Sequence, residues 1–72
     1  MPSPEFSPSA LTEARKAKGL TRNQLAQLAK VGHQTVARLE RGEYAPRSAT
    51  FVALANALGL SISDLYTEER AA

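Results

Sequence analysis

Apolar residues recur along this chain at intervals of three and four positions, the spacing that places side chains on one face of a helix. Each run is short, and four of the runs are closed by a glycine or by a turn that contains one. Glycine ends helices readily because it adopts the left-handed conformation. The pattern predicts helices over 10–18, 22–29, 33–41 and 48–58, and a fifth short helix that contains Ile62, Leu65 and Tyr66. No segment alternates as a strand does, so the sequence predicts an all-α fold.

Capping residues and apolarity refine this picture. Thr21 and Gln24 have the spacing of a capping box, and Ser61 with Asp64 repeats a cap pattern before the fifth helix. The fourth run is the most apolar and is predicted to be the central buried helix. The residues predicted to form the core are Leu25, Ala26, Ala29, Val31, Val36, Leu39, Phe51, Leu54, Ala55, Leu58 and Leu60.

The ends of the chain differ from its middle. The first eight residues include three prolines and two serines, which do not continue a helix, so we expect a disordered arm over 1–8. A single domain is predicted over 9–67, followed by a charged tail over 68–72. A chain of 72 residues has room for one domain only.

Composition excludes several classes of protein. The sequence contains no cysteine and one histidine, His33, so neither a disulfide framework nor a zinc site of cysteines and histidines is expected. It has no phosphate-cradling glycine loop, and its acids are scattered, so we expect no enzyme and no cofactor. No apolar run approaches the roughly 20 residues of a membrane span, and the N-terminus does not resemble a signal peptide. We therefore expect a cytoplasmic protein that does not bind a membrane.

The charge is unevenly distributed. The net charge is only +2, but residues 9–63 carry eight basic and three acidic side chains, a net charge of +5. A basic body with acidic ends suits a polyanionic partner such as nucleic acid. An ordinary solvated surface explains the same charges, and charge alone does not decide between the two interpretations.

The second and third predicted helices are joined by a turn of three residues, as a helix-turn-helix requires. Residues 20–42 read LTRNQLAQLAKVGHQTVARLERG, and residues 54–61 read LANALGLS. With Ala45-Pro46 between them, these segments resemble the Cro and phage-repressor (XRE) family over residues 11–66. The resemblance implies a compact five-helix, lambda-repressor-like DNA-binding domain. The chain departs from the family pattern at Arg22, Lys30 and Gly32, which replace a glutamine, the turn glycine and a serine or threonine.

The resemblance implies that the third predicted helix is the one that reads DNA. The residues predicted to face base edges are His33, Gln34, Thr35 and Arg38. Arginine can donate two hydrogen bonds to guanine, and glutamine can pair in the same way with adenine. The alternative interpretation is that these are simply exposed polar residues.

A second group of residues is predicted to hold phosphates or to orient the helices. The predicted phosphate ligands are Thr21, Arg22, Asn23, Gly32, Tyr44 and Arg47. Tyr44 has the alternative of packing on its own loop. The resemblance further implies a structural ion pair between Arg15 and Glu40, which fixes orientation without touching DNA.

The predicted function is that of a small transcriptional regulator, of repressor or controller type, at a palindromic operator in the nucleoid. Two reading helices double the base contacts, so a homodimer is expected, with its interface at Ile62, Leu65 and Tyr66. These residues have the alternative of capping the monomer's own core. A rival function is a protein-interaction module, such as an antitoxin or an adaptor, that uses the same fold to bind a toxin or RNA polymerase.

Overall fold

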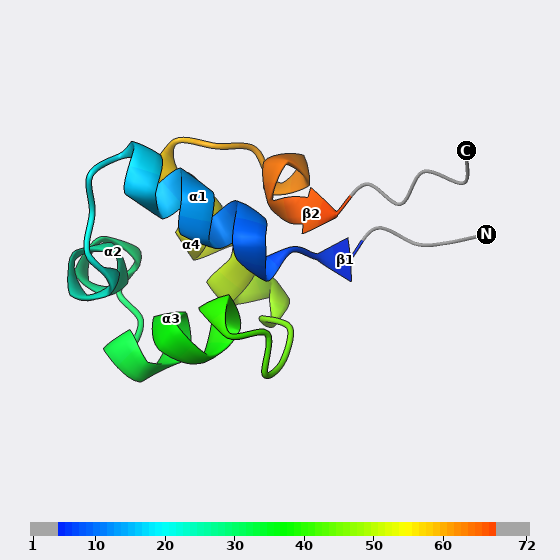
Figure 1. Cartoon of the computed structure of the whole chain (residues 1–72), viewed down its shortest axis with the longest axis horizontal. Coiled ribbons are helices and arrows are strands. Elements are labelled where there is room, and N and C mark those ends of the chain that lie inside the picture. Colours follow the sequence, from blue (N-terminus) through cyan, green and yellow to red (C-terminus); the bar gives the residue numbers. More distant parts are fainter. Residues whose placement is uncertain (1–4, 68–72) are drawn as a thin grey trace.

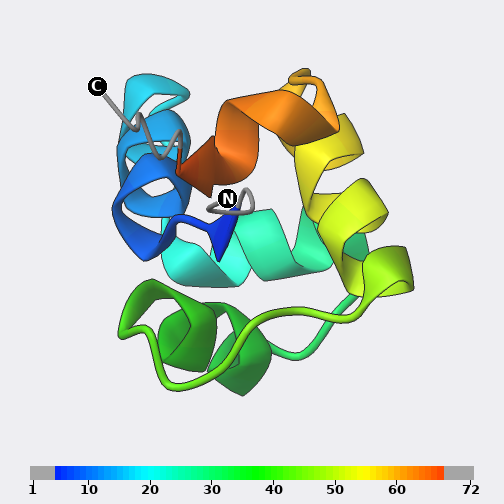
Figure 2. The same cartoon turned by 90° about the vertical axis from the view of Figure 1, so that its right-hand side faces the viewer.

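The computed structural model describes residues 5–67. In chain order its elements are β1 (Glu5–Phe6), α1 (Pro8–Ala17), α2 (Arg22–Ala29), α3 (His33–Glu40), α4 (Ser48–Leu58), the 3-10 helix η1 (Ile62–Leu65) and β2 (Tyr66–Thr67). The four α-helices surround one core, and α3 lies at the opposite end of the molecule from η1 (Figures 1 and 2). The predicted tail over 68–72 and the first four residues of the predicted arm lie outside the described residues.

The core is aliphatic, with one buried aromatic ring. Its members are Leu11, Leu25, Ala26, Ala29, Val36, Leu39, Phe51, Leu54, Ala55, Leu58 and Leu65. Nine of the predicted core residues are among them, while Val31 and Leu60 are partly buried against the cluster. Helix α4 contributes four core residues, more than any other helix of residues 5–67, although its Val52 is 40% exposed.

Local chemistry accounts for the helix ends. The Thr21 hydroxyl accepts a hydrogen bond from the Gln24 amide at 3.0 Å, and the Gln24 side chain accepts one from the Thr21 amide at 2.8 Å, which completes the predicted capping box. Helix α2 ends at Lys30, whose φ of 60° and ψ of 43° place it in the left-handed region. A lysine thus occupies a conformation that favours glycine.

The expected disordered arm was wrong for residues 5–8. Pro8 begins α1, because the first turn of a helix does not need the amide that proline lacks. The Ser7 hydroxyl caps that helix by accepting a hydrogen bond from the Ala10 amide at 3.2 Å. The Phe6 ring lies edge-on to Phe51, with ring centroids 5.6 Å apart, so it has an apolar partner that local composition does not reveal.

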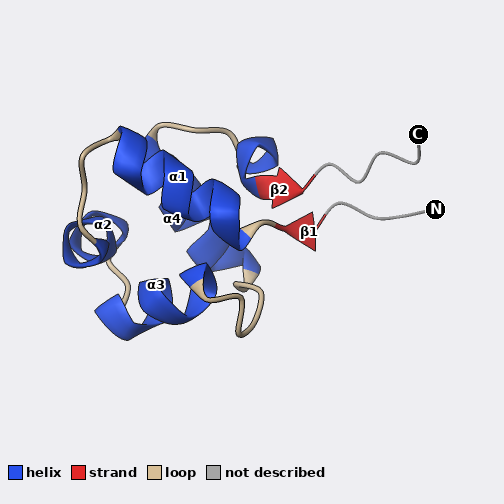
Figure 3. Cartoon of the chain, in the orientation of Figure 1, coloured by secondary structure: helices blue, strands red, loops and turns tan. Residues whose placement is uncertain are grey.

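Two short strands also depart from the expected purely helical architecture. β1 pairs antiparallel with β2, with Phe6 opposite Tyr66 (Figure 3). The expected fifth helix is a single 3-10 turn of four residues. The chain leaves this turn at Leu65 in order to pair with β1, so a helix through Tyr66 does not form. The all-α class holds, but with four α-helices in residues 5–67.

Candidate nucleic-acid interface

Helices α2 and α3 form a helix-turn-helix in which α3 turns one side to the core and the other to solvent. Only Val36 and Leu39 of α3 are buried. His33, Gln34 and Arg38 are exposed on the helix, and Gln34 and Arg38 lie one turn apart on the same face. The structure therefore places three of the predicted base-reading side chains in full reach of a ligand, whereas Thr35 is half-buried.

The N-termini of α3 and α4 lack side-chain caps. Within residues 5–67, neither N-cap, Gly32 of α3 nor Arg47 of α4, makes a side-chain capping hydrogen bond. The caps of α1 and α2 are formed by Ser7 and Thr21. The first amides of α3 and α4 are therefore open to an external acceptor, and the helix dipole favours an anion there.

A hollow of about 620 Å³ lies between the start of α3 and the start of α4. Its lining residues are Val31, Thr35, Tyr44, Ala45, Pro46, Arg47 and Thr50. Tyr44 is 45% exposed, and it lines this hollow together with residues of its own loop. This hollow brings two predicted phosphate ligands, Tyr44 and Arg47, beside the start of α3.

A shallower hollow of about 560 Å³ lies at the start of α2. Its lining residues are Arg15, Gly19, Leu20, Thr21, Arg22 and Asn23. Three of the predicted phosphate ligands therefore gather here, around the N-terminus of a helix. Five of the six predicted phosphate ligands thus fall into two groups, one at each hollow, and the sixth, Gly32, is the N-cap of α3.

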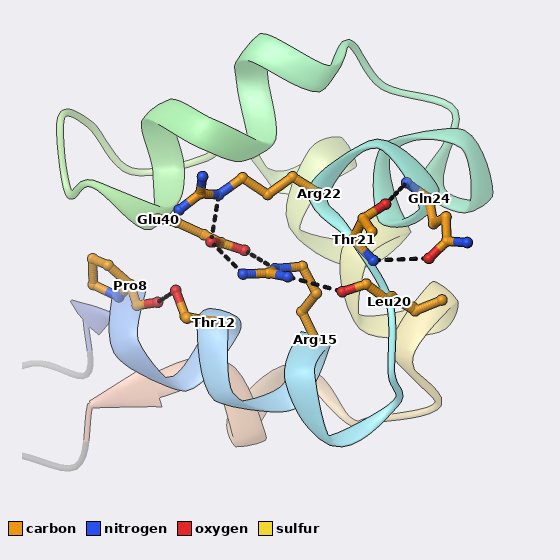
Figure 4. Close-up of polar contacts among 8 residues, drawn as sticks. All are labelled: Pro8, Thr12, Arg15, Leu20, Thr21, Arg22, Gln24 and Glu40. Carbon is orange, nitrogen blue, oxygen red and sulfur yellow. Dashed lines mark hydrogen bonds and ion pairs between the residues drawn. The ribbon is translucent and has the colours of Figure 1, made fainter.

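Glu40 binds two arginines at once (Figure 4). Its carboxylate accepts hydrogen bonds from Arg15 Nε at 2.6 Å and from Arg22 Nε at 3.0 Å. Arg15 also donates to the Leu20 carbonyl at 2.8 Å, which ties α1 to the start of α2. The structure thus contains the expected ion pair between Arg15 and Glu40, and Arg22 forms a second ion pair with the same carboxylate.

The Glu40 side chain is only 1% exposed, whereas that of Arg22 is 53% exposed. Burial acts to raise the pKa of Glu40, but hydrogen bonds and charges from Arg15 and Arg22 outweigh it, so the pKa lies below its ordinary value. The carboxylate is therefore ionised at neutral pH. With two cations on one anion, the group keeps a net charge of +1 beside the hollow at α2.

The contact between Arg22 and Glu40 was missed at the sequence level. The two residues are 18 positions apart, and no local pattern connects them. Arg22 was predicted only as a phosphate ligand.

A second group that the sequence analysis missed is Glu43, whose carboxylate lies within ion-pair distance of both Arg38 and Arg41. An acid directly after a reading helix was the available signal for this group.

The predicted dimer interface is only partly available. Leu65 is fully buried in the monomer core, so its assignment to an interface was wrong. The 3-10 turn points this residue inward while Ile62, at the start of the same turn, stays 37% exposed. The backbone of Tyr66 lies in β2. Val52 on α4 and Leu28 on α2 are further exposed hydrophobic residues.

Over residues 5–67, no three potential metal-ligating side chains gather. None of the helices there has the length and apolarity needed to span a bilayer.

Comparison with known proteins agrees with this arrangement. The profile of the helix-turn-helix family matches residues 11–65. The immunity repressor protein of Bacillus phage phi105 is 40% identical over 55 residues, which cover 76% of this chain and 38% of the repressor. The chain therefore spans well under half the length of that curated relative.

Solved structures share the fold. The restriction-modification controller protein C.AhdI from Aeromonas hydrophila superposes with a TM-score of 0.78 at 33% identity, covering 81% of this chain and 88% of the controller. The P22 c2 repressor, solved with a synthetic operator, gives a TM-score of 0.79 over 85% of this chain and 92% of the repressor. At 23% identity, the second likeness shows the fold alone.

Proposed function

This chain belongs to the helix-turn-helix family of DNA-binding regulators, and from this premise we propose that it regulates transcription by binding a short inverted repeat as a dimer. The observation that carries the proposal is the exposed outer face of α3, which is flanked by two groups of predicted phosphate ligands. Such a face is long enough to enter the major groove, and its flanks are placed to grip the backbone on either side.

Base reading is assigned to α3. Arg38 donates two hydrogen bonds to a guanine, and Gln34, one turn earlier, pairs with an adenine. His33 stands at the helix start, and Thr35 faces the flanking hollow, where its methyl group or hydroxyl meets a thymine or the backbone. These contacts supply the sequence preference.

Phosphate binding is assigned to the two flanks. On one side are Arg22 and the α2 amides near Thr21 and Asn23; on the other are Tyr44 and Arg47, with the uncapped start of α4. The Gly32 amide adds a donor at the start of α3. Such contacts set position and strengthen binding to every sequence alike, because all duplexes share the same backbone.

The test compares substitutions at the two kinds of site. Fluorescence anisotropy would measure the dissociation constant on a duplex selected by the protein from a randomised library and on a shuffled duplex, across a range of salt. Arg38→Ala should cost about 1–3 kcal/mol of discrimination at one base pair. Arg22→Ala should weaken both complexes alike and reduce the salt slope by about one unit.

The control is Lys18→Ala, which removes the same unit of charge at the far end of α1. The Lys18 ammonium lies beside Gly59 at the end of α4, away from α3. Its loss should leave discrimination unchanged. Equal weakening on both duplexes by Arg38→Ala would remove Arg38 from the reading set, and a wild-type protein without salt-sensitive binding would contradict DNA binding altogether and favour a protein-interaction module.

The dimer is proposed to form through the exposed apolar residues near the chain's C-terminal half, with Ile62 at its centre. A dyad places two reading helices about 34 Å apart, so half-sites should lie about 10 base pairs apart. Ile62→Lys should shift sedimentation from dimer to monomer, whereas Leu28→Lys on α2 should not. Sedimentation of the wild type as a monomer at tens of micromolar, with equal affinity for one half-site and two, would disprove the dimer.

A further inference from the structure

The first residue beyond the turn that ends α3 is an acid held beside a reading arginine. Helix α3 ends at Glu40, Arg41 follows as its C-cap, and Gly42 turns the chain with a φ of 75°. The next amide, that of Glu43, donates a hydrogen bond to the Arg38 carbonyl at 3.1 Å. The helix end itself therefore fixes the Glu43 backbone next to Arg38.

The carboxylate of Glu43 is fixed as well. Arg41 Nε donates a hydrogen bond to Glu43 Oε2 at 2.8 Å, while Glu43 Oε1 lies 3.9 Å from Arg38 Nε. The Arg38 and Glu43 side chains are 53% and 45% exposed. One oxygen is thus anchored by Arg41, and the other faces the Nε side of the Arg38 guanidinium at the solvent surface.

We propose that Glu43 is a specificity-determining residue, which positions Arg38 for a guanine and opposes its use on phosphate. This inference rests on the proposed DNA-binding function. With Nε turned toward Glu43, the two terminal nitrogens of Arg38 point away from the carboxylate, and end-on pairing with guanine O6 and N7 needs only those two nitrogens. Arg38 can therefore read guanine without leaving Glu43.

On DNA of random sequence, the contacts open to Arg38 are different from those on a guanine-containing site. Arg38 has no matching base edge there, and its remaining partner is a phosphate, another anion that competes with the carboxylate for the same cation. Glu43 also repels any phosphate that approaches, because like charges at short range disfavour a complex. The carboxylate therefore weakens non-specific binding more than binding to a guanine-containing site.

The test uses Glu43→Gln, which removes the charge and keeps the shape. Dissociation constants would be measured by anisotropy on a duplex selected by the wild type from a randomised library and on its shuffled counterpart. We expect tighter binding to the shuffled duplex and a ratio of the two constants reduced about three- to five-fold, the scale of an exposed ion pair. Glu13→Gln, which removes an exposed acid on α1, should leave the ratio unchanged, and thermal melting would show that both variants fold.

A second pair of variants separates Arg38 from Arg41 as the residue through which Glu43 acts. In an Arg38→Ala background, Glu43→Gln should no longer change the ratio, whereas in an Arg41→Ala background a reduction should remain. The reverse pattern, or an unchanged ratio in the single variant, overturns the inference. A wild type that binds neither duplex overturns the proposed function too, so the two failures are distinguishable.

Discussion

The side chain of Glu40 joins three segments of the chain through one carboxylate. It accepts hydrogen bonds from Arg15 on α1 and Arg22 on α2, and it lies at the end of α3. A charge that is 1% exposed is costly to bury, and here the two arginines compensate that cost. Because Arg15 is itself 10% exposed, the loss of Glu40 leaves a buried cation with only the Leu20 carbonyl.

Glu40→Ala should therefore lower the free energy of unfolding by about 3 kcal/mol, the cost of breaking a buried pair from one side. Chemical denaturation at pH 7 measures this change in the free energy of unfolding. Glu13→Ala, at an exposed position on α1, is the control and should change stability by less than about 0.5 kcal/mol. Equal unfolding midpoints for the two variants would show that the pair does not stabilise the fold.

Stability should also depend on pH through Glu40. Its pKa is lower in the folded chain than the value of about 4.3 expected when unfolded, so its stabilisation is complete above that pH and is lost as the pH falls through the folded pKa. The stability difference between wild type and Glu40→Gln should be constant from pH 7 to about pH 5 and shrink below about pH 4. A difference that grows on acidification would contradict the lowered pKa.

Among the elements, the turn between α2 and α3 sets the orientation of α3, the proposed reading helix. The turn depends on Lys30, which adopts the left-handed conformation, and on Val31, whose amide donates to the Ala26 carbonyl at 3.0 Å. A non-glycine residue in that conformation costs roughly 1–2 kcal/mol. The helix-turn-helix therefore forms against a local strain that packing of α2 on α3 and α4 must offset.

Lys30→Gly should relieve this strain. Part of the gain is offset by the greater freedom of glycine in the unfolded chain, so the net stabilisation should be up to about 1 kcal/mol. Thermal melting measures the change. Gly59→Ala, at a φ of 69°, is the opposite substitution and should destabilise by at least about 1 kcal/mol. A destabilised Lys30→Gly variant would show that the lysine side chain stabilises the fold by more than its left-handed backbone conformation destabilises it.

At the scale of the whole molecule, β1 and β2 join the two ends of the described chain on the side away from α2 (Figure 1). The Ser7 amide continues this link by donating to the Leu65 carbonyl at 2.8 Å. The Phe6 ring then covers the edge of the core at Phe51. A domain this small buries a limited fraction of its surface, so one added aromatic ring is a sizeable part of its core.

Phe6→Ala should accordingly lower the free energy of unfolding by about 2 kcal/mol, less than the loss expected for a fully buried ring because Phe6 is only partly buried. For a domain of this size that corresponds to a fall in melting temperature of roughly 8–16 °C. Val52→Ala, on the exposed side of α4, is the control and should lower the melting temperature much less. An unchanged melting temperature for Phe6→Ala would mean that the packing of this ring on Phe51 does not contribute to stability.

Local patterns in the sequence were enough to predict helices α1 to α4, most of the core and the position of the helix-turn-helix. These features follow from local spacing: a helix repeats every 3.6 residues, a capping box needs residues three apart, and a glycine after an apolar run commonly ends a helix. Accordingly, α4 has the predicted bounds, and α3 begins at the predicted residue. The Arg15–Glu40 contact was expected only through family resemblance, because 25 residues separate the two.

Local patterns did not predict the strand pair, the docking of Phe6, the burial of Leu65 or the ion pair between Arg22 and Glu40. Each depends on residues from distant parts of the chain meeting in space, and composition near Phe6 or Leu65 does not say which partner will lie beside it. Proline-rich composition predicted a disordered arm, yet residues 5–8 form β1, the cap of α1 and its first residue, and Phe6 lies against Phe51 of α4. Burial and charge pairing belong to the assembled fold, since the free energy of a contact depends on whether its surroundings exclude water.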